Sequence, residues 1–245
     1  MEPDPTLVVA YASARAAVLE RIAAACARVG REPASVKLIA VSKMVDAKRL
    51  RAAVAAGLTE LGENRIQEAA AKAPLVPGAA WHLVGHLQGN KARLALGIFE
   101  TIKSVDSIEL AQRLDRLVGE GAGTTRLPIL LQVNVDEDPA KDGFEADGLR
   151  STLAAILTLP NVEVRGLMTV GRLAEAPGQA RTTFAGLRAF SASLQADAPG
   201  LGPELSMGMS DDFEVAVEEG ATIVRVGRAI FGERLQTDGP DHPGR

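Results

Sequence analysis

The chain begins with one amphipathic stretch and then changes to a regular alternation of short apolar runs and helical patterns. Over residues 5–29, apolar side chains return at roughly helical spacing, and Gly30 follows the last of them. This pattern predicts a helix that ends at the glycine. Beyond it, apolar runs of strand length alternate with stretches in which apolar residues recur every three or four positions. Such an alternation is typical of strands that are each followed by a helix.

Eight strand–helix pairs are predicted in succession. The predicted strands occupy residues 36–41, 58–62, 80–85, 101–105, 127–135, 162–168, 204–207 and 222–226. The helices that follow them occupy residues 46–56, 64–73, a stretch from about 89, 107–118, 147–157, 178–196, 211–219 and a turn from about 229.

The number of pairs and the chain length decide between two arrangements. A doubly wound open sheet shows the same alternation, but eight pairs within 245 residues fit a (β/α)8 barrel better. We therefore predict an α/β protein, a TIM-type barrel preceded by an N-terminal helix, that forms a single domain over residues 1–235. Two prolines and two glycines within residues 236–245 predict a disordered tail.

Composition narrows the range of functions. The formal net charge is −4, which argues against a general binder of nucleic acid or of anionic membranes. Cys26 is the only cysteine, so we expect neither an intrachain disulfide nor a cysteine-rich metal site. The N-terminus is acidic where a signal peptide would be basic, and charged residues interrupt the apolar stretches before they reach membrane-spanning length. These features predict a cytoplasmic protein.

In a barrel of this kind, the active site lies at the carboxyl ends of the strands. Lys43 follows the first predicted strand, so we expect its amine at the mouth of the barrel. Partial burial there would lower the pKa of the lysine, and the unprotonated amine could then attack an aldehyde and form a Schiff base. The alternative is a strand-end lysine whose charged end reaches solvent.

Two glycine-containing turns near the C-terminus predict an anion site. Residues 206–211 join the seventh strand to its helix, and residues 226–228 do the same after the eighth strand. Barrels often bind phosphate between these two loops, at the N-terminus of a helix. The alternative is turn chemistry alone, in which Ser210 or Asp211 caps the helix and Glu214 completes a capping box.

Three further polar residues lie on predicted strands or in the loops after them. Arg225 stands between two valines on the eighth strand, where it would form an internal salt bridge or donate to a ligand heteroatom. His82 and His86 lie on a strand and a loop without an HExxH motif or a nearby cysteine, so we expect no metal site. We interpret His82 as a ring that contacts a ligand or completes a hydrogen-bond network.

Short motifs spread over residues 38–232 resemble those of one protein family. In chain order they are Leu38 to Lys43 (LIAVSK), Gly62-Glu63-Asn64 with Gln67-Glu68, Trp81 to Gln88 (WHLVGHLQ) with Asn90-Lys91, Arg165 to Met168 (RGLM), Leu205 to Asp212 (LSMGMSDD), and Val224 to Gly227 (VRVG) with Ile230 to Gly232 (IFG). Together they resemble the pyridoxal phosphate homeostasis proteins, which are single-domain relatives of the N-terminal barrel of alanine racemase.

The resemblance implies a cofactor and the residues that hold it. Lys43 would carry pyridoxal 5′-phosphate (PLP) as a Schiff base. Ser206 and the backbone of Gly227 and Arg228 would hold the phosphate, and Arg225 would face the pyridine nitrogen. The family is associated with binding PLP and keeping free PLP in balance, and the resemblance implies no catalytic residue.

The resemblance also implies a pocket around the ring, lined by Asn64, His82 and Met168. Two residues depart from the family pattern. Arg228 stands where many members have Thr or Ser, so a hydroxyl contact to the phosphate is missing, although the N–H remains and the guanidinium could compensate. Arg65 stands where some relatives have Tyr, which could alter the rim of the pocket.

Two features favour a carrier over an enzyme. A cationic Arg225 facing the pyridine nitrogen would disfavour its protonation and weaken the ring as an electron sink. The related racemases take a second acid/base, a tyrosine, from a C-terminal domain of a partner subunit, whereas the only tyrosine here is Tyr11 in the N-terminal helix. We therefore predict a monomeric PLP carrier or regulator without efficient catalysis, able to pass PLP to apo-enzymes. The alternatives are a racemase-like PLP enzyme and a barrel without a cofactor.

Overall fold

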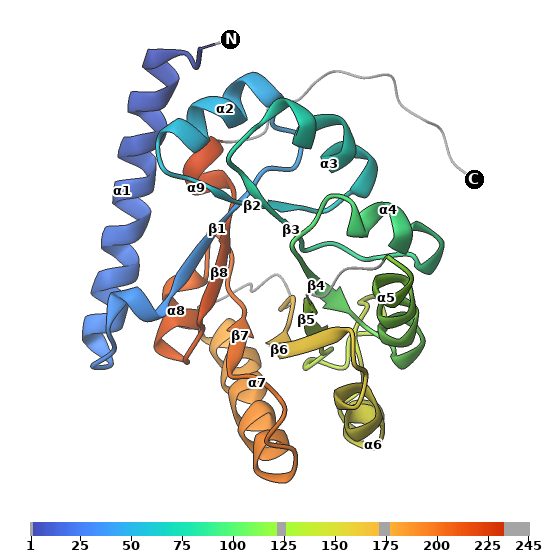
Figure 1. The fold of residues 1–245 in the computed structure, drawn as a ribbon. Helices are drawn as coiled ribbons and strands as arrows, with labels where there is room; N and C mark the ends of the chain where they lie inside the picture. The colour runs from blue at the N-terminus through green and yellow to red at the C-terminus, as the bar shows by residue number, and fades with distance from the viewer. Residues whose placement is uncertain (1, 122–125, 172–176, 233–245) are drawn as a thin grey trace, which may run out of the picture.

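The computed structural model describes residues 2–121, 126–171 and 177–232, and their parallel strands form one closed barrel (Figure 1). The strands are β1 (Lys37–Val41), β2 (Glu60–Glu63), β3 (Ala80–Leu83), β4 (Thr101–Val105), β5 (Leu127–Gln132), β6 (Val162–Met168), β7 (Glu204–Ser206) and β8 (Ile223–Val226). β1 pairs with β2 on one side and with β8 on the other. This pairing confirms the predicted (β/α)8 barrel and excludes an open sheet, which would leave two edge strands.

A helix follows each strand, and one more precedes the barrel. The helices are α1 (Pro5–Arg28), α2 (Ala47–Ala55), α3 (Ile66–Lys72), α4 (Ala92–Leu96), α5 (Ile108–Glu120), α6 (Ala146–Leu157), α7 (Pro177–Asp197), α8 (Phe213–Glu218) and α9 (Arg228–Phe231). α1 begins where predicted because the Asp4 side chain accepts a hydrogen bond from the Thr6 N–H at 3.1 Å and proline suits the first helical turn. Figure 1 shows α1 standing along the outside of the barrel, where it packs against α2 and α8.

Several element boundaries differ from the prediction by one to three residues, and two of the differences have a local cause. The fifth strand ends at Gln132 rather than residue 135, since the Phe144 N–H donates to the Gln132 carbonyl oxygen at 2.7 Å. The helix after β7 begins at Phe213 rather than residue 211, since Asp212, with a φ of −134°, is outside the helical conformation. The predicted tail at 236–245 lies outside the described residues.

Side chains along each strand point alternately towards the helices and into the barrel. The outward set packs with the helices into the main hydrophobic core. A separate apolar cluster consists of Ile39, Leu130, Met168 and Ile223, each at most 2% exposed. Gly62 is adjacent to this cluster, because a Cβ at that position would lie 2.8 Å from Ile39 Cγ2. The barrel interior is therefore a packed core, and ligands can be received only at its ends.

None of the helices in the described ranges combines the length and the hydropathy needed to cross a bilayer.

Candidate functional site

The pairing of β1 with β8 brings Lys43 and the last predicted phosphate-binding turn to the same part of the barrel mouth. Ala40 is the register partner of Val226, so the segments after β1 and β8 leave the sheet side by side. A Cβ on Gly227 would lie 3.3 Å from the Val41 carbonyl oxygen, which shows how closely the turn after β8 lies against the end of β1. The fold thus joins two predicted site features that lie near opposite ends of the sequence.

Lys43 lies in the turn directly after β1, and its side chain is exposed. The partial burial that we expected for this amine is therefore not found. The residues on either side of Lys43 are held in defined conformations. Ser42 is fully buried, and Met44 has a φ of 63°, in the left-handed region that residues other than glycine rarely adopt. The lysine projects from a turn whose backbone has little freedom.

Polar side chains from β2 and α3 hold the peptide groups of this turn. The ammonium of Lys72 donates to the Ser42 carbonyl oxygen at 2.9 Å. It also donates to Glu63 Oε1 at 2.8 Å and to Glu68 Oε1 at 2.5 Å. Glu68 Oε1 accepts a second hydrogen bond, from the Met44 N–H at 2.5 Å. Prediction from the sequence missed Lys72, for which the available signal is its four-residue spacing from Glu68 on one helix.

Glu63 connects this network to the interior of the protein. Its carboxylate is fully buried, and its Oε1 also accepts from the Ser42 hydroxyl at 2.9 Å. Burial raises the pKa of Glu63, and the hydrogen bond from Lys72 opposes that shift. An ion pair hidden from water in this way depends on both of its partners, because either charge alone would be costly to bury.

Arg225 is buried at the junction of the last three strands. Its Nη1 donates to Ser206 Oγ at 2.8 Å, and its Nη2 donates to the Thr169 carbonyl oxygen at 2.8 Å. Burial lowers the pKa of Arg225 to about 10, and the charge of Asp212 opposes this shift. The guanidinium therefore remains cationic at neutral pH and is fixed beside the hydroxyl of Ser206, which is itself fully buried.

Glycine is required in the turn after β7. Gly208 has a φ of 90°, and a Cβ there would lie 2.5 Å from the Ala216 Cβ and 2.9 Å from the Phe213 Cα. Neither the backbone conformation nor the space accepts a larger residue. The close contact seats the turn directly on α8, beside the end of β7.

The helix cap in this turn differs from the prediction. Asp212, rather than Ser210 or Asp211, precedes α8, and its carboxylate accepts a hydrogen bond from the Met209 N–H at 2.6 Å. The Ser210 hydroxyl instead accepts from the Gly227 N–H at 3.2 Å. This hydrogen bond links the turns after β7 and β8, so the two predicted parts of the anion site are in contact.

The two departures from the family pattern both lie at the surface. The guanidinium of Arg228 forms an ion pair with Asp211, which directs it towards the β7–α8 loop. The backbone of Arg228 begins α9, and the first N–H groups of a helix have no acceptor within it. Arg65 is exposed and directly precedes α3.

The residues predicted around the ring lie at different depths. Asn64 is exposed and follows β2. Its backbone is in tight contact with the end of β3, since a Cβ on Gly85 would lie 2.4 Å from the Asn64 carbonyl oxygen. Met168 is fully buried in the apolar cluster of the barrel interior. The structure therefore places Asn64 at the mouth and Met168 in the packed interior.

The hydrogen-bond partner of His82 lies towards the end of the barrel opposite the mouth. Its Nε2 lies 2.7 Å from Glu60 Oε2, and Lys37 Nζ lies 3.5 Å from the same oxygen. Glu60 and Lys37 are the first residues of β2 and β1, whereas Lys43 follows the last residue of β1. The hydrogen bond from His82 lowers the pKa of Glu60 to about 2, and burial lowers the pKa of His82. Of the two interpretations of His82, this contact supports the hydrogen-bond network.

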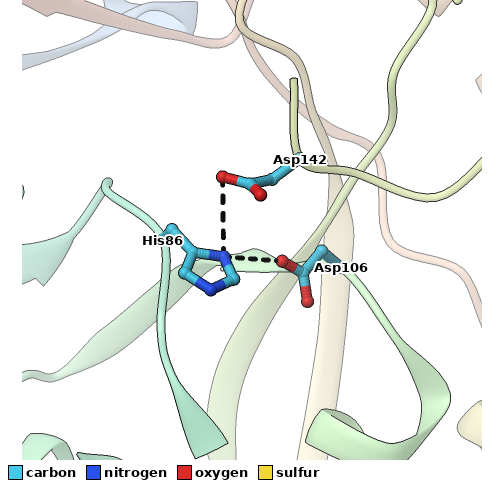
Figure 2. Close-up of side chains that lie close together, drawn as sticks. All are labelled: His86, Asp106 and Asp142. Atoms are coloured by element: carbon cyan, nitrogen blue, oxygen red, sulfur yellow. Dashed lines mark hydrogen bonds and ion pairs between the residues drawn. The ribbon is translucent and has the colours of Figure 1, made fainter. Parts of the chain in front are cut away.

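Figure 2 shows a second group of polar residues at the mouth, which prediction from the sequence missed. His86 Nδ1 lies 2.9 Å from Asp106 Oδ2 and 3.5 Å from Asp142 Oδ2. The three residues follow β3, β4 and β5, so only the order of strands in the barrel brings them together. Imidazole and carboxylate groups can bind divalent cations, but exposed acidic groups are also common without one. The group therefore assigns no metal.

Comparison with known proteins adds a relationship to this geometry. The family described as "Alanine racemase, N-terminal domain" matches residues 15–235. The pyridoxal phosphate homeostasis protein of Aquifex aeolicus (strain VF5) is 41% identical over 219 residues, which cover 89% of this chain and 95% of that protein. The chain belongs to the pyridoxal phosphate homeostasis protein family. The resemblance in the short motifs is confirmed.

Solved structures of relatives agree with this family. PipY of Synechococcus elongatus PCC7942, solved with PLP bound, is 45% identical and has a TM-score of 0.77, with 86% of this chain and 100% of that chain covered. Alanine racemase from Corynebacterium glutamicum is 18% identical with a TM-score of 0.64, covering 91% of this chain and 64% of that chain. At that identity the racemase shows a shared fold alone. A relative that is 45% identical to this chain thus has PLP in its structure.

Proposed function

We propose that this protein binds PLP through Lys43 and takes part in keeping the supply of PLP in balance. The observation that carries the proposal is the juxtaposition of Lys43 with the linked turns after β7 and β8, which follows from the pairing of β1 with β8. The family membership and the PLP-bound relative support the same ligand.

The donor groups at this rim fit a phosphate-bearing aldehyde. PLP supplies an aldehyde carbon that can condense with an amine, with loss of one water, to give a Schiff base. The exposed side chain of Lys43 provides the amine, and the backbone N–H of Arg228 provides a donor for the phosphate. The Gly227 N–H would add a second donor by exchanging its hydrogen bond to the Ser210 hydroxyl. The Ser206 hydroxyl adds a donor, because its oxygen accepts from Arg225 Nη1 and its hydrogen can then point to the phosphate.

The remaining contacts belong to the ring. Arg225 would face the pyridine nitrogen, with Asn64 at the rim and Met168 beneath the ring. His82 is hydrogen-bonded to Glu60. We therefore assign His82 to holding the barrel wall rather than to a polar contact with the ligand. Arg228 would contribute its backbone N–H, while its side chain keeps Asp211 in place.

A carrier fits this site better than an efficient racemase. The buried guanidinium of Arg225 remains cationic, so it disfavours a proton on a ring nitrogen facing it and weakens stabilisation of a carbanion, without abolishing it, since racemases of this fold also use an arginine. The missing second acid/base therefore decides. The chain's only tyrosine, Tyr11, is 4% exposed, and its hydroxyl accepts a hydrogen bond from Arg49 Nε at 2.7 Å. It is packed on α1 beside Phe231 and cannot act as a second acid/base at the mouth.

The test is the absorbance spectrum of the purified protein with PLP, before and after borohydride. We expect an imine band that borohydride fixes on the peptide containing Lys43, and loss of that band in Lys43→Ala. Lys48→Ala serves as the matched control, because Lys48 is an exposed lysine on the next helix. No band in the wild type, or an equal band in Lys43→Ala, would contradict the proposal.

Two further experiments separate a carrier from an enzyme. Chiral analysis of small amino acids incubated with the PLP-loaded protein should show no efficient racemisation, and fast racemisation would favour the racemase-like alternative. Incubation with an apo-PLP enzyme should restore its activity faster than free PLP does, if the protein passes on its ligand. The monomeric state and the cytoplasmic location expected from the sequence belong to this proposal and can be checked by ultracentrifugation and cell fractionation.

A further inference from the structure

We propose that Lys72 and Glu68 of α3 form a clamp on the turn that carries Lys43 and so set the direction in which its amine meets an aldehyde. This inference rests on the proposed function of Lys43. It makes Lys72 and Glu68 positioning residues, which act through the backbone of residues 42–44.

The clamp holds the backbone on both sides of Lys43. On the N-terminal side, the Lys72 ammonium donates to the Ser42 carbonyl oxygen at 2.9 Å. On the C-terminal side, Glu68 Oε1 accepts from the Met44 N–H at 2.5 Å. The two side chains are joined to each other at 2.5 Å, so the peptide groups flanking Lys43 are connected through one ion pair.

Backbone strain indicates why the clamp is needed. Met44 has a φ of 63°, and a methionine in the left-handed region is stable only where surrounding contacts hold it there. The carboxylate of Glu68 provides such a contact directly at the Met44 N–H. Without it, the turn could relax to a more ordinary conformation, and the Lys43 side chain would leave the rim at a different angle.

Burial of charge leads to the same conclusion. The Lys72 side chain is 11% exposed and the Glu63 side chain 0%. Stability alone does not explain such a pair, because apolar residues can often replace a buried ion pair without loss of unfolding free energy. Apolar side chains could not, however, hold a carbonyl oxygen and an N–H group in place. The chain keeps a buried cation at the position where it can reach the peptide group before Lys43.

The charged groups that meet at Lys72 explain how the clamp stays rigid. Glu63, from β2, and Glu68, from the preceding turn of α3, both accept from the ammonium. The Ser42 hydroxyl donates to Glu63 Oε1 at 2.9 Å and closes the network on the β1 side. Lys72 Nζ therefore connects three segments: the end of β1, the end of β2, and α3.

The experiment compares Glu68→Ala with Glu68→Gln in the full-length protein. The amide oxygen of glutamine can still accept from the Met44 N–H, so this conservative variant should restore what alanine removes. Because the Glu68 side chain is partly exposed, we expect both variants to fold. Lys72→Met is the second probe, and Lys48→Met on the surface of α2 is its matched control.

Two readouts are needed, and the first requires no PLP. Hydrogen exchange at the Met44 amide should rise in Glu68→Ala and return towards wild type in Glu68→Gln. The second readout is the rate at which the imine band forms with PLP. Misdirection of the amine should slow it about tenfold or more in Glu68→Ala and Lys72→Met, since small displacements of reacting groups are costly. Lys48→Met should change neither measurement.

The possible results separate the two proposals. If the wild type forms no imine on Lys43, the proposed function fails and the positioning role fails with it. If the wild type forms the imine and the two clamp variants form it equally fast, the positioning inference alone is wrong. Unchanged exchange at Met44 in Glu68→Ala would also overturn it, because the carboxylate would then not hold the turn. Slower imine formation together with faster Met44 exchange supports the clamp.

Discussion

Arg225 Nη1 lies 2.8 Å from Ser206 Oγ, so the buried cation of β8 and the hydroxyl of β7 form one polar unit. Neither group is more than 4% exposed. The unit lies next to the turn that carries Gly208, whose carbonyl oxygen accepts from the Arg225 N–H at 3.0 Å. A change in either side chain is therefore expected to affect both the stability of the barrel and the proposed phosphate site.

Ser206→Ala should lower both stability and affinity for PLP. Loss of the hydroxyl leaves one arm of a buried guanidinium without its acceptor, which should cost about 1–3 kcal/mol of unfolding free energy. Loss of a phosphate donor should weaken PLP binding about tenfold. Ser193→Ala is the control, because Ser193 also accepts from an arginine, Arg150, but at the surface. Urea unfolding and PLP titration measure the two effects, and equal losses in the two variants would contradict the prediction.

Lys72→Met should destabilise the protein more than removal of the whole ion pair. The single substitution leaves the carboxylate of Glu63 buried without its cation, which should cost about 3–5 kcal/mol. The double variant Glu63→Gln with Lys72→Met should regain much of this loss. Unfolding free energies of the wild type, both single variants and the double variant complete a mutant cycle. Additive effects of the two substitutions would show that the charges do not interact.

The contact between Glu60 and His82 predicts a loss of stability in acid. Both pKa values are lowered in the folded protein, that of Glu60 from 4.5 to about 2. Each group therefore contributes to stability at pH values above its ordinary pKa, and the contribution is lost as the pH falls. For His82 the loss begins below the ordinary pKa of 6.5. For Glu60 it occurs between pH 4.5 and about 2. Lys37, beside the same carboxylate, supports the charged form.

Glu60→Gln should therefore flatten the stability curve between pH 4.5 and about 2. The effect should be about 1 kcal/mol, because the carboxylate is partly exposed and water screens its interactions. Glu163→Gln is the control, since Glu163 pairs with Arg165 at the surface at 2.9 Å. Unfolding free energies measured across this pH range provide the comparison, and parallel curves for wild type and Glu60→Gln would refute the prediction.

Two glycine-to-alanine substitutions should have opposite effects. At Gly208 the φ of 90° and the 2.5 Å approach to the Ala216 Cβ make a methyl group costly, by about 1–3 kcal/mol, and should displace the turn that contributes to the anion site. Gly148 lies in α6, and a Cβ there would meet nothing within 4 Å. Gly148→Ala should therefore stabilise the helix by about 0.5–1 kcal/mol. Thermal unfolding distinguishes the two, and destabilisation by both would contradict this account.

The sequence was sufficient to predict the features that depend on local pattern. Eight apolar runs with helical stretches between them indicate the barrel, and the barrel rule places Lys43, Asn64 and Gly227 at its mouth. The roles of individual residues at the site remain predictions. What local pattern cannot contain is the identity of each side chain's partner.

Three particular contacts show this limit. The contact of His86 with Asp106 depends on the neighbouring positions of β3 and β4 in the closed sheet. The hydrogen bond of His82 to Glu60 depends on how far two adjacent strands are displaced along each other. Lys72 belongs to a helix whose orientation on the barrel decides whether its ammonium meets solvent or the peptide after β1.

The closing pair of strands has a consequence for how the protein is made. β1 is synthesised early and β8 late, yet the two must pair before the ring is complete. Contacts between segments so distant in sequence are slow to form, because the ends of a long loop must first meet. A ligand that binds both Lys43 and the turn at Gly227 spans this seam and favours the closed ring over any opened form. A nascent chain that lacks β8 also lacks the turn at Gly227, so under the proposed function full affinity for the ligand requires the completed ring.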